Sequence, residues 1–284
     1  MNAVRLDVRR SARSAAVAAL VANVLIVLTG ALVRLTGSGL GCPTWPSCTG
    51  DSFVTTPEMG GHGVVEFGNR VLGIVVGLIT LALVVAVARD RDRPPKTLPL
   101  AVAVLVGVGA QGLIGGLSVR YELAPAIVAA HFLSSMVLVA ALVVLVDLLG
   151  RDAGPRAPAD ARTRWVVGAL PVALSAVMVL GSLVTGAGPH AGDENALRFG
   201  FDPAVVTSAH AAAVVVMVVL QVAAVVLVRN SAAVVLLAVS VAQGAIGSAQ
   251  EALALPVPLV AAHVVTGALV VAATTNLVVR TLRV

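Results

Sequence analysis

Residues 126–149 read AIVAAHFLSSMVLVAALVVLVDLL, an apolar run that contains one aspartate and one histidine. About 20 predominantly apolar residues are enough for a helix to cross the hydrocarbon core of a bilayer. Similar runs recur along the chain, and we expect eight membrane-spanning helices, at residues 15–36, 64–88, 97–119, 126–149, 164–186, 203–228, 231–250 and 257–279. The sequence therefore predicts an all-α membrane protein.

The composition agrees with this class. Of the 284 residues, 58% are hydrophobic and 12% are charged, whereas a soluble domain carries about 25% charged residues. The predicted spans use nearly the whole chain, so any chemistry must lie within or just outside the bilayer. The first apolar run continues into Arg34 and a Gly-rich loop without a small-residue cleavage site, and we expect a true span there rather than a signal peptide.

The basic residues predict the orientation. Of 19 basic residues, 15 fall on one side of the predicted spans: Arg5, Arg9, Arg10, Arg13, Arg89, Arg91, Arg93, Lys96, Arg151, Arg156, Arg162, Arg164, Arg229, Arg280 and Arg283. Basic loops stay cytoplasmic, which predicts a multi-pass protein of the bacterial cell membrane with both termini cytoplasmic. The positive charge is then a topology signal and argues against a nucleic-acid partner.

The chain also repeats itself. Residues 111–115, QGLIG, match residues 243–247, QGAIG, at an offset of 132, and the same offset carries Ala130-His131 onto Ala262-His263. Residues 30–33 similarly resemble residues 181–184. We interpret this as a parallel duplication of four helices, related by an axis along the membrane normal. Chance similarity among Gly- and Val-rich spans is the alternative.

The predicted organisation is two repeated four-helix bundles. Residues 1–149 form the first half and residues 164–284 the second. The segment 150–163 between them is polar and Pro-rich, and we expect a cytoplasmic tether.

Three of the five histidines lie inside predicted spans: His131, His210 and His263. Each falls five to seven positions after the start of its span, which predicts one layer roughly 8–10 Å below the outer surface. A proton path would need polar groups across the full depth, and a zinc or copper site would need several ligands close together. One histidine per helix, on neighbouring helices of a bundle, favours heme ligation. The alternative to heme ligation is a structural role, in which each histidine packs between helices and forms a hydrogen bond with a backbone carbonyl.

The ligand count differs between the halves. The second half offers two axial ligands, His210 and His263, suited to a stable low-spin heme that transfers electrons. The first half offers His131, with Glu66 and Asn69 opposite. A heme there would keep an open iron face. This asymmetry predicts one electron-transfer heme and one reactive or exchangeable heme.

Glu66 and Arg70 are four residues apart and share a helix face. They form either a salt bridge at the membrane edge or a site in which the carboxylate lies beside a substrate heme and moves protons. His62 and His190 are expected in loops or at the interface, with a propionate contact open for His190.

Cys42 and Cys48, the only cysteines, fall in the first outer loop. An even number of cysteines in a short loop on an oxidising side predicts a disulfide, either a structural staple or a redox-active pair. Arg34 and Arg120 lie near the same surface. Either guanidinium would suit heme propionates, and Arg34 is favoured because it is expected to face the buried part of the loop.

Residues 32–48, LVRLTGSGLGCPTWPSC, resemble the first-loop signature of heme A synthases. The stretch from Glu66 to Arg70, the intramembrane histidines and the duplicated halves extend the resemblance over most of the chain. It implies oxidation of a methyl group of heme O to a formyl group by successive hydroxylations, giving heme A for terminal oxidases. It also implies a heme b held by His210 and His263.

The resemblance further places heme O in the first half, with His131 as a ligand and Glu66 as a catalytic group. Arg34, Asn69 and Arg70 are our further candidates for contacts with the heme. The family pattern at the second span is commonly Glu-x-x-His-Arg, and this chain has Asn69 at the His position. Implied partners are a heme O synthase, a membrane electron donor and cytochrome oxidase assembly factors; a homo-oligomer stays open. The competing hypothesis is a non-catalytic b-type cytochrome or heme-delivery protein, and a transporter is a third.

Overall fold

The computed structural model describes residues 2–150 and 159–282. In this part of the chain eight α-helices are long and apolar enough to cross a membrane. They are α1 (Asn2–Leu35), α2 (Gly60–Arg89), α3 (Thr97–Arg120), α4 (Pro125–Gly150), α5 (Ala161–Ala187), α6 (Pro203–Val228), α7 (Ser231–Ala252) and α8 (Val257–Leu282), with a 3-10 turn η1 (Pro57–Met59) before α2. Each predicted span coincides with one helix, so the prediction of an all-α, multi-pass membrane protein is confirmed. Most of the predicted linker, residues 151–158, lies outside the described residues.

Local sequence explains where several helices begin. Pro125 and Pro203 occupy the first positions of α4 and α6, where proline loses no helical hydrogen bond. Asp160, Asp202 and Asn230 cap α5, α6 and α7, and each side chain accepts a hydrogen bond of 2.8–2.9 Å from a backbone N–H two or three residues later. These caps satisfy donors that a helix start leaves unpaired.

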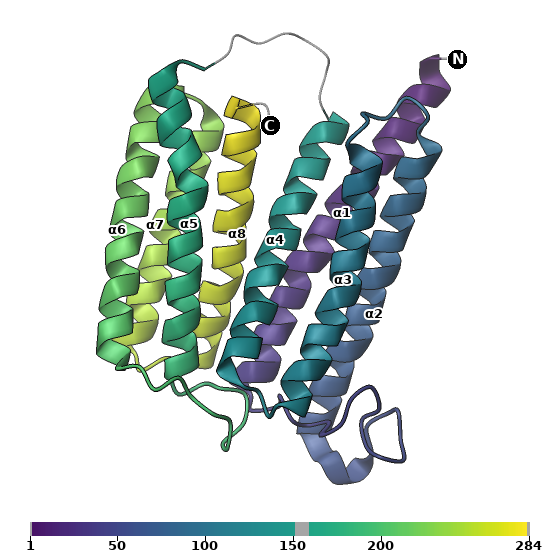
Figure 1. Ribbon diagram of the computed structural model, residues 1–284, viewed down its shortest axis with the longest axis vertical. Coiled ribbons are helices and arrows are strands. Elements are labelled where there is room, and N and C mark those ends of the chain that lie inside the picture. Colours follow the sequence, from purple (N-terminus) through teal and green to yellow (C-terminus); the bar gives the residue numbers. More distant parts are fainter. Residues whose placement is uncertain (1, 151–158, 283–284) are drawn as a thin grey trace.

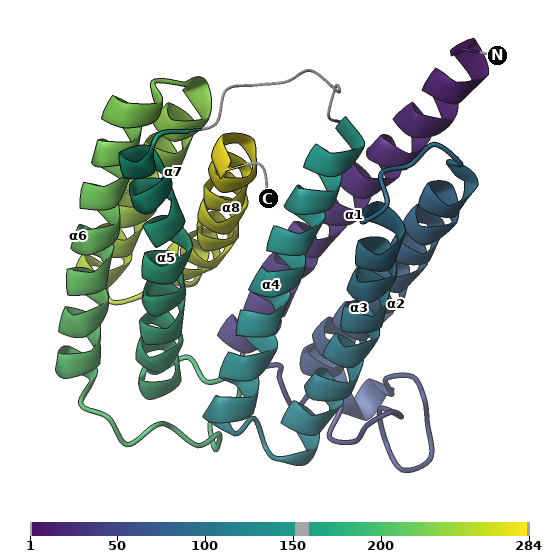
Figure 2. The same ribbon diagram turned by 45° about the horizontal axis from the view of Figure 1, so that its top comes forward.

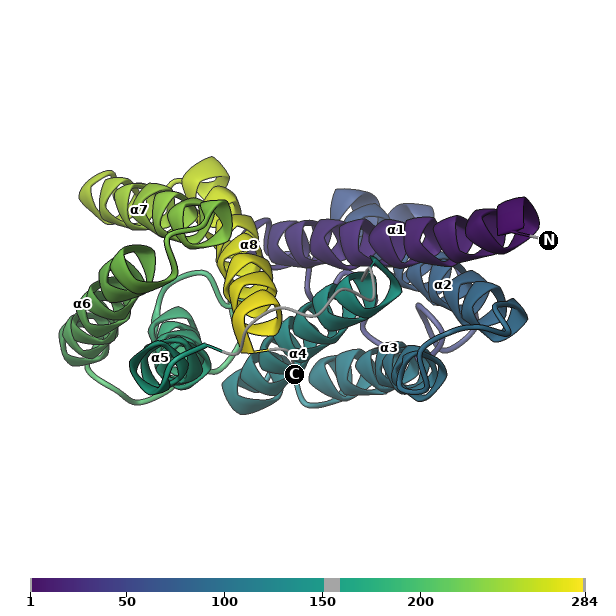
Figure 3. The same ribbon diagram turned by 90° about the horizontal axis from the view of Figure 1, so that it is seen from above.

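The helices of each half contact one another in a closed ring. In the first half α1 contacts α2, α2 contacts α3, α3 contacts α4, and α4 contacts α1; α5 to α8 contact in the same order. Helices two apart therefore stand at opposite corners of a ring. The rings lie side by side and join where α8 contacts α1 and α4, and α4 contacts α5 (Figure 3).

The junction between the halves is a packed apolar core. Val27 of α1 and Met136 and Val139 of α4 are buried in the same cluster as Leu236 and Leu277 of the second half. Close side-chain packing is the main force that holds helices together inside a bilayer. The two rings are therefore held in a defined relation to each other.

The connections divide between two ends of the molecule. The loops 36–56 and 188–202 lie at one end, here called the loop end, together with the α3–α4 and α7–α8 turns (Figures 1 and 2). The start of α1 and the end of α8 lie at the opposite end. Both helices thus reach the same surface.

Two of these turns share an unusual backbone. Glu122 and Leu123 have φ values of 49° and 59°, and Ala254 and Leu255 have values of 60° and 61°. Positive φ is uncommon for residues other than glycine. In each turn the second residue donates a 2.7 Å backbone hydrogen bond to the carbonyl five residues earlier. The pairs are 132 residues apart, the offset that relates the sequence matches.

Candidate functional site

The three intramembrane histidines lie near the loop end of their helices. His131 is six residues after the start of α4, His210 seven after the start of α6, and His263 six after the start of α8. At about 1.5 Å per residue each lies roughly 9–10 Å along its helix. All three side chains are half-buried.

The helices that carry His210 and His263 are not neighbours. Among the described residues α6 packs against α5 and α7, and α8 reaches α7 and α5. The prediction of neighbouring histidine-bearing helices is wrong for His210 and His263, because the ring places α6 and α8 at opposite corners, whereas α4 and α8, which carry His131 and His263, are in contact. Imidazoles from opposite corners can approach a planar macrocycle from its two faces.

Each imidazole packs against a glycine of an adjacent helix. A Cβ atom added to that glycine would lie 3.0–3.5 Å from the imidazole Cε1 atom. The pairs are Gly115 with His131, Gly181 with His210, and Gly247 with His263. At Gly181 and Gly247 the added atom would be closer to Nδ1 than to Nε2. The Cε1 edge of each ring therefore faces the glycine, with Nδ1 on the nearer side and Nε2 on the farther side.

Hydrogen bonds within the described residues do not use the Nε2 atoms, and the Nδ1 atom of His263 is also buried without a partner. His210 Nδ1 lies 3.0 Å from the carbonyl oxygen of Val177 and donates to it when it carries the proton. Across residues 2–150 and 159–282, no hydrogen bond joins the Nε2 atom of His131, His210 or His263 to another group. A neutral imidazole binds iron through a nitrogen lone pair, with its proton on the other nitrogen. The three histidines thus fit axial ligands of heme.

Two glutamines that sequence reasoning did not assign to the site accompany these histidines. The Gln111 amide lies 2.8 Å from His131 Nδ1. In the orientation that satisfies both amide atoms, its nitrogen donates to Nδ1 and its oxygen accepts from the hydroxyls of Ser134 and Ser135 at 3.1 and 3.0 Å. When Nδ1 carries the proton, as iron binding through Nε2 requires, the amide turns over: its oxygen accepts from Nδ1 and its nitrogen donates to the two hydroxyls. Gln243 donates instead to the backbone carbonyl of His263 at 3.0 Å. The signal was the equal spacing of 20 residues between glutamine and histidine in both halves.

Asn69 takes the place in the first half that His210 takes in the second. Its side-chain oxygen accepts a 2.8 Å hydrogen bond from Thr29, six residues before the end of α1. His210 packs against Gly181, six residues before the end of α5. Residues 2–150 therefore place one imidazole, that of His131, in this layer, with an amide opposite.

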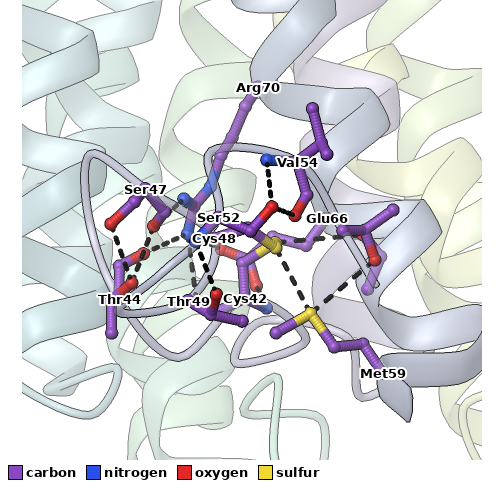
Figure 4. Close-up of a disulfide and its surroundings, with 12 residues drawn as sticks. Cys42, Thr44, Ser47, Cys48, Thr49, Ser52, Val54, Met59, Glu66 and Arg70 are labelled. Atoms are coloured by element: carbon purple, nitrogen blue, oxygen red, sulfur yellow. Dashed lines mark hydrogen bonds and ion pairs between the residues drawn. A yellow bond between two sulfur atoms is a disulfide. The ribbon is translucent and has the colours of Figure 1, made fainter. Parts of the chain in front are cut away.

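The first outer loop is tied to α2 by a buried carboxylate (Figure 4). Cys42 and Cys48 form a disulfide, with their Cα atoms 4.5 Å apart. Glu66 is 5% exposed. One of its oxygens accepts from the backbone N–H of Cys42 at 2.6 Å, and the other accepts from Arg70 at 2.6 Å. Both carboxylate oxygens thus have strong partners.

Arg70 continues this network into the loop. Its guanidinium donates to the backbone carbonyls of Cys42 and Thr44, each at 3.0 Å, and of Ser47 at 3.2 Å (Figure 4). The salt bridge between Glu66 and Arg70, one of the two predicted alternatives, is therefore present. The rest of the Arg70 guanidinium is engaged with backbone carbonyls of the loop.

Further contacts fix the loop at its edges. His62 is exposed in the first turn of α2, and its Nδ1 lies 2.9 Å from the Ser38 hydroxyl. The Trp45 indole packs against Gly116 of α3, where a Cβ atom would clash with the ring. The loop is thus fixed over the loop end of α2 and α3.

Three basic side chains gather where the halves meet. Arg34 donates at 2.8 Å to the carbonyl of Thr185 at the end of α5, so it turns to the second half rather than into the first loop. Partial burial and the charges of Arg34 and Arg198 lower the pKa of His190. Within the described residues no carboxylate is in ion-pair distance of Arg34 or Arg198. This arrangement suits an anion. Arg120 is exposed at the end of α3.

A model of the family described as "Cytochrome oxidase assembly protein" matches residues 13–62 and 54–192. The matched residues contain the first loop, Glu66, Arg70 and His131. This chain belongs to that family. His210 and His263 lie beyond the matched segments, so their assignment depends on the geometry described above.

Relatives named heme A synthase agree with this membership. The protein of Halalkalibacterium halodurans is 29% identical over 137 residues, covering 48% of this chain and 45% of the relative. That of Alkalihalophilus pseudofirmus is 31% identical over 129 residues, 45% and 43% of the two chains. That of Lysinibacillus sphaericus is 33% identical over 177 residues, 60% and 56%. The chain spans about half the length of the curated relatives it matches. The resemblance to the heme A synthase family is confirmed.

Proposed function

We propose that this chain is a heme A synthase, an enzyme that oxidises a methyl group of heme O to a formyl group by successive hydroxylations. The observation that carries the proposal is the placement of three imidazoles with free Nε2 atoms. Two stand at opposite corners of one ring, and one stands alone in the other ring. Family membership and the names of the relatives supply the substrate.

The chemistry defines what the site must do. Each hydroxylation replaces a C–H bond of the methyl group by a C–O bond, and after the second the geminal diol loses water to leave the formyl group. The net change from CH3 to CHO adds one oxygen atom and removes two hydrogen atoms. With dioxygen as the oxidant, each hydroxylation places one oxygen atom in the C–O bond and reduces the other to water with two electrons and two protons, so a membrane electron donor is part of the proposal.

In the second half, His210 and His263 would hold a heme b. When bound, that heme would supply electron transfer to the substrate site. The bond from His210 Nδ1 to Val177 orients its ring and keeps the Nε2 lone pair available. The glycines beside both rings provide the space in which the imidazoles stand.

In the first half, His131 would hold heme O, with Asn69 on the opposite corner. One protein ligand leaves a face of the substrate open. We assign proton transfer to Glu66, which would exchange one of its two hydrogen bonds to receive a proton. Arg34 is the proposed propionate partner, together with Arg198 and His190, because Arg70 is engaged with the loop.

Topology and partners complete the proposal. The matching left-handed turns at the offset of 132 residues support a parallel duplication of the halves 1–149 and 164–284. The 15 basic residues on one side support cytoplasmic termini, with the cysteine loop outside. Heme O synthase would deliver the substrate, and cytochrome oxidase assembly factors would receive the product. A second copy of the chain, in a homo-oligomer, is a further candidate partner.

A non-catalytic b-type cytochrome or heme-delivery protein is the second candidate, favoured by Asn69 and by the engaged carboxylate of Glu66. Expression of the chain beside a heme O synthase, with pigment extraction and chromatography, separates the two functions. Heme A that forms only in the presence of the chain supports the enzyme. Bound heme b with unconverted heme O, in an aerobic and reducing host, supports the carrier.

The glycine beside His263 gives a specific prediction. In Gly247→Ala the new methyl group would lie 3.0 Å from the imidazole Cε1 atom, and overpacking of this kind costs about 1–3 kcal/mol. We expect the heme b content to fall about fivefold or more, measured by the pyridine hemochrome spectrum per mole of protein. Gly244→Ala is the matched control, because on the same helix its methyl group meets nothing within 4 Å. Equal heme in the two variants would contradict the assigned geometry.

A further inference from the structure

A cavity of about 300 Å³ lies between the two halves, where α1, α4 and α8 meet. Its lining residues belong to the first part of α1 and the last parts of α4 and α8, and these parts lie at the end of the molecule opposite the loop end (Figure 1). Arg13 and Leu20 line it from α1, Val143 and Gly150 from α4, and Ala272 and Arg280 from α8. It is separate from the histidine layer.

The lining from α1 and α8 is basic near the surface and apolar deeper, while α4 supplies Gly150 at the surface and Asp147 one turn deeper. Nearest the helix ends it contains Arg13, Gly150 and Arg280. Seven or eight residues deeper it contains Leu20, Val143 and Ala272, which lie about 10–12 Å farther into the membrane. The cavity is charged at the surface and apolar toward the interior. A phospholipid, with a phosphate headgroup above acyl chains, has the same profile.

The charge at the surface end is net positive. Two guanidinium groups, from Arg13 and Arg280, share the lining with the Asp147 carboxylate and the Asn276 amide. The Asp147 side chain is not without a partner, and it is one negative charge against two positive ones. Within the described part of the chain, neither arginine side chain forms a hydrogen bond or an ion pair with a protein group. Basic pockets between helices at a membrane surface bind anionic lipid headgroups, and guanidinium groups bind phosphate oxygens in pairs.

We propose that this cavity binds one anionic phospholipid. Its phosphate lies between Arg13 and Arg280, and the beginning of an acyl chain lies along Leu20, Val143 and Ala272. Because the lining comes from α1 and α4 of the first half and from α8 of the second, the lipid would bridge the halves. This site is independent of the proposed heme reaction.

Native mass spectrometry of the purified full chain tests the proposal, with phosphatidylglycerol and phosphatidylcholine added in separate titrations. We expect one phosphatidylglycerol to be retained about tenfold better than phosphatidylcholine. Arg13→Gln and Arg280→Gln should each remove most of that preference. Ala272→Leu, which fills the apolar part without changing the charge, should also displace the lipid. Arg164→Gln is the matched control. It also removes one exposed positive charge, from the start of α5, at the same end of the molecule as the cavity but outside its lining.

Three results would overturn the site. They are full retention of phosphatidylglycerol in Arg280→Gln, an equal loss in Arg164→Gln, or equal retention of the two lipids by the wild-type chain. Should an arginine variant lose its helical circular dichroism, Ala272→Leu decides, because lipid kept by this variant refutes the cavity as the site. The readout is lipid mass, so failure of the heme proposal would leave it unchanged.

Discussion

Replacement of His263 by alanine is expected to remove the heme b proposed for the second half, with bound heme falling about tenfold or more. The imidazole stands across the ring of helices from His210, and its Nε2 atom is farther from Gly247 than its Nδ1 atom. Alanine offers no ligand, and a six-coordinate heme that loses one of two axial bonds changes its spin state and is released more easily. The measurement is heme per mole of purified protein, with the visible spectrum of the residual pigment.

His210→Ala should have the same effect, because the two imidazoles would bind opposite faces of one iron. His62→Ala is the matched control: this histidine is exposed in the first turn of α2 and bonds Ser38, so full heme content is expected. Full heme in either intramembrane variant would remove that residue from the ligand assignment.

Replacement of Glu66 by alanine is the second change with a large expected effect. Heme A production should fall about a hundredfold or more, as for the loss of a group that transfers protons, while the heme b of the second half is kept. The buried carboxylate also accepts from Cys42 and from Arg70, so its removal would free the loop as well. The alanine variant alone does not distinguish these roles.

Glu66→Gln separates them. The amide oxygen still accepts one of the two hydrogen bonds and fills the same volume, but the side chain no longer transfers a proton. We expect a loop that stays in place, judged by protection of the Cys42–Cys48 disulfide from reduction, and no heme A. Glu58→Gln, in the exposed η1 turn, is the control. Normal heme A production by Glu66→Gln would show that Glu66 has only a structural role, as the partner of Arg70.

The eight helices were predictable because lipid imposes a simple rule on sequence: a span must be apolar for about 20 residues. The residues at which the helices begin were harder to predict. The helix α2 begins at Gly60, although the apolar run begins at residue 64. Its first turn is held by the loop, through Ser38 on His62 and through the close approach of Gly41 to Gly63. Contacts between distant segments leave no periodic signal.

The same limit explains what sequence reasoning missed in the site. The histidines were visible because ionisable residues are rare in spans. Which helices are diagonal, and which glycine faces which imidazole, depends on packing. The bond from Arg34 to Thr185 joins residues 151 positions apart, and nothing near Arg34 in the sequence indicates it. Gln111 and Gln243 were visible as a repeat, while their contacts with His131 and His263 depend on the fold.

The packing of α1 against α8 has a consequence for how the protein is made. More than 200 residues separate the end of α1 from the start of α8. At a synthesis rate of about 5–20 residues per second, α1 waits roughly 10–45 s for this partner. During that interval the faces of α1 and α4 that later contact α8 are open to lipid or to the insertion machinery. The first ring, closed by its own contacts, must therefore persist alone in the membrane until the second ring is translated and docks against it.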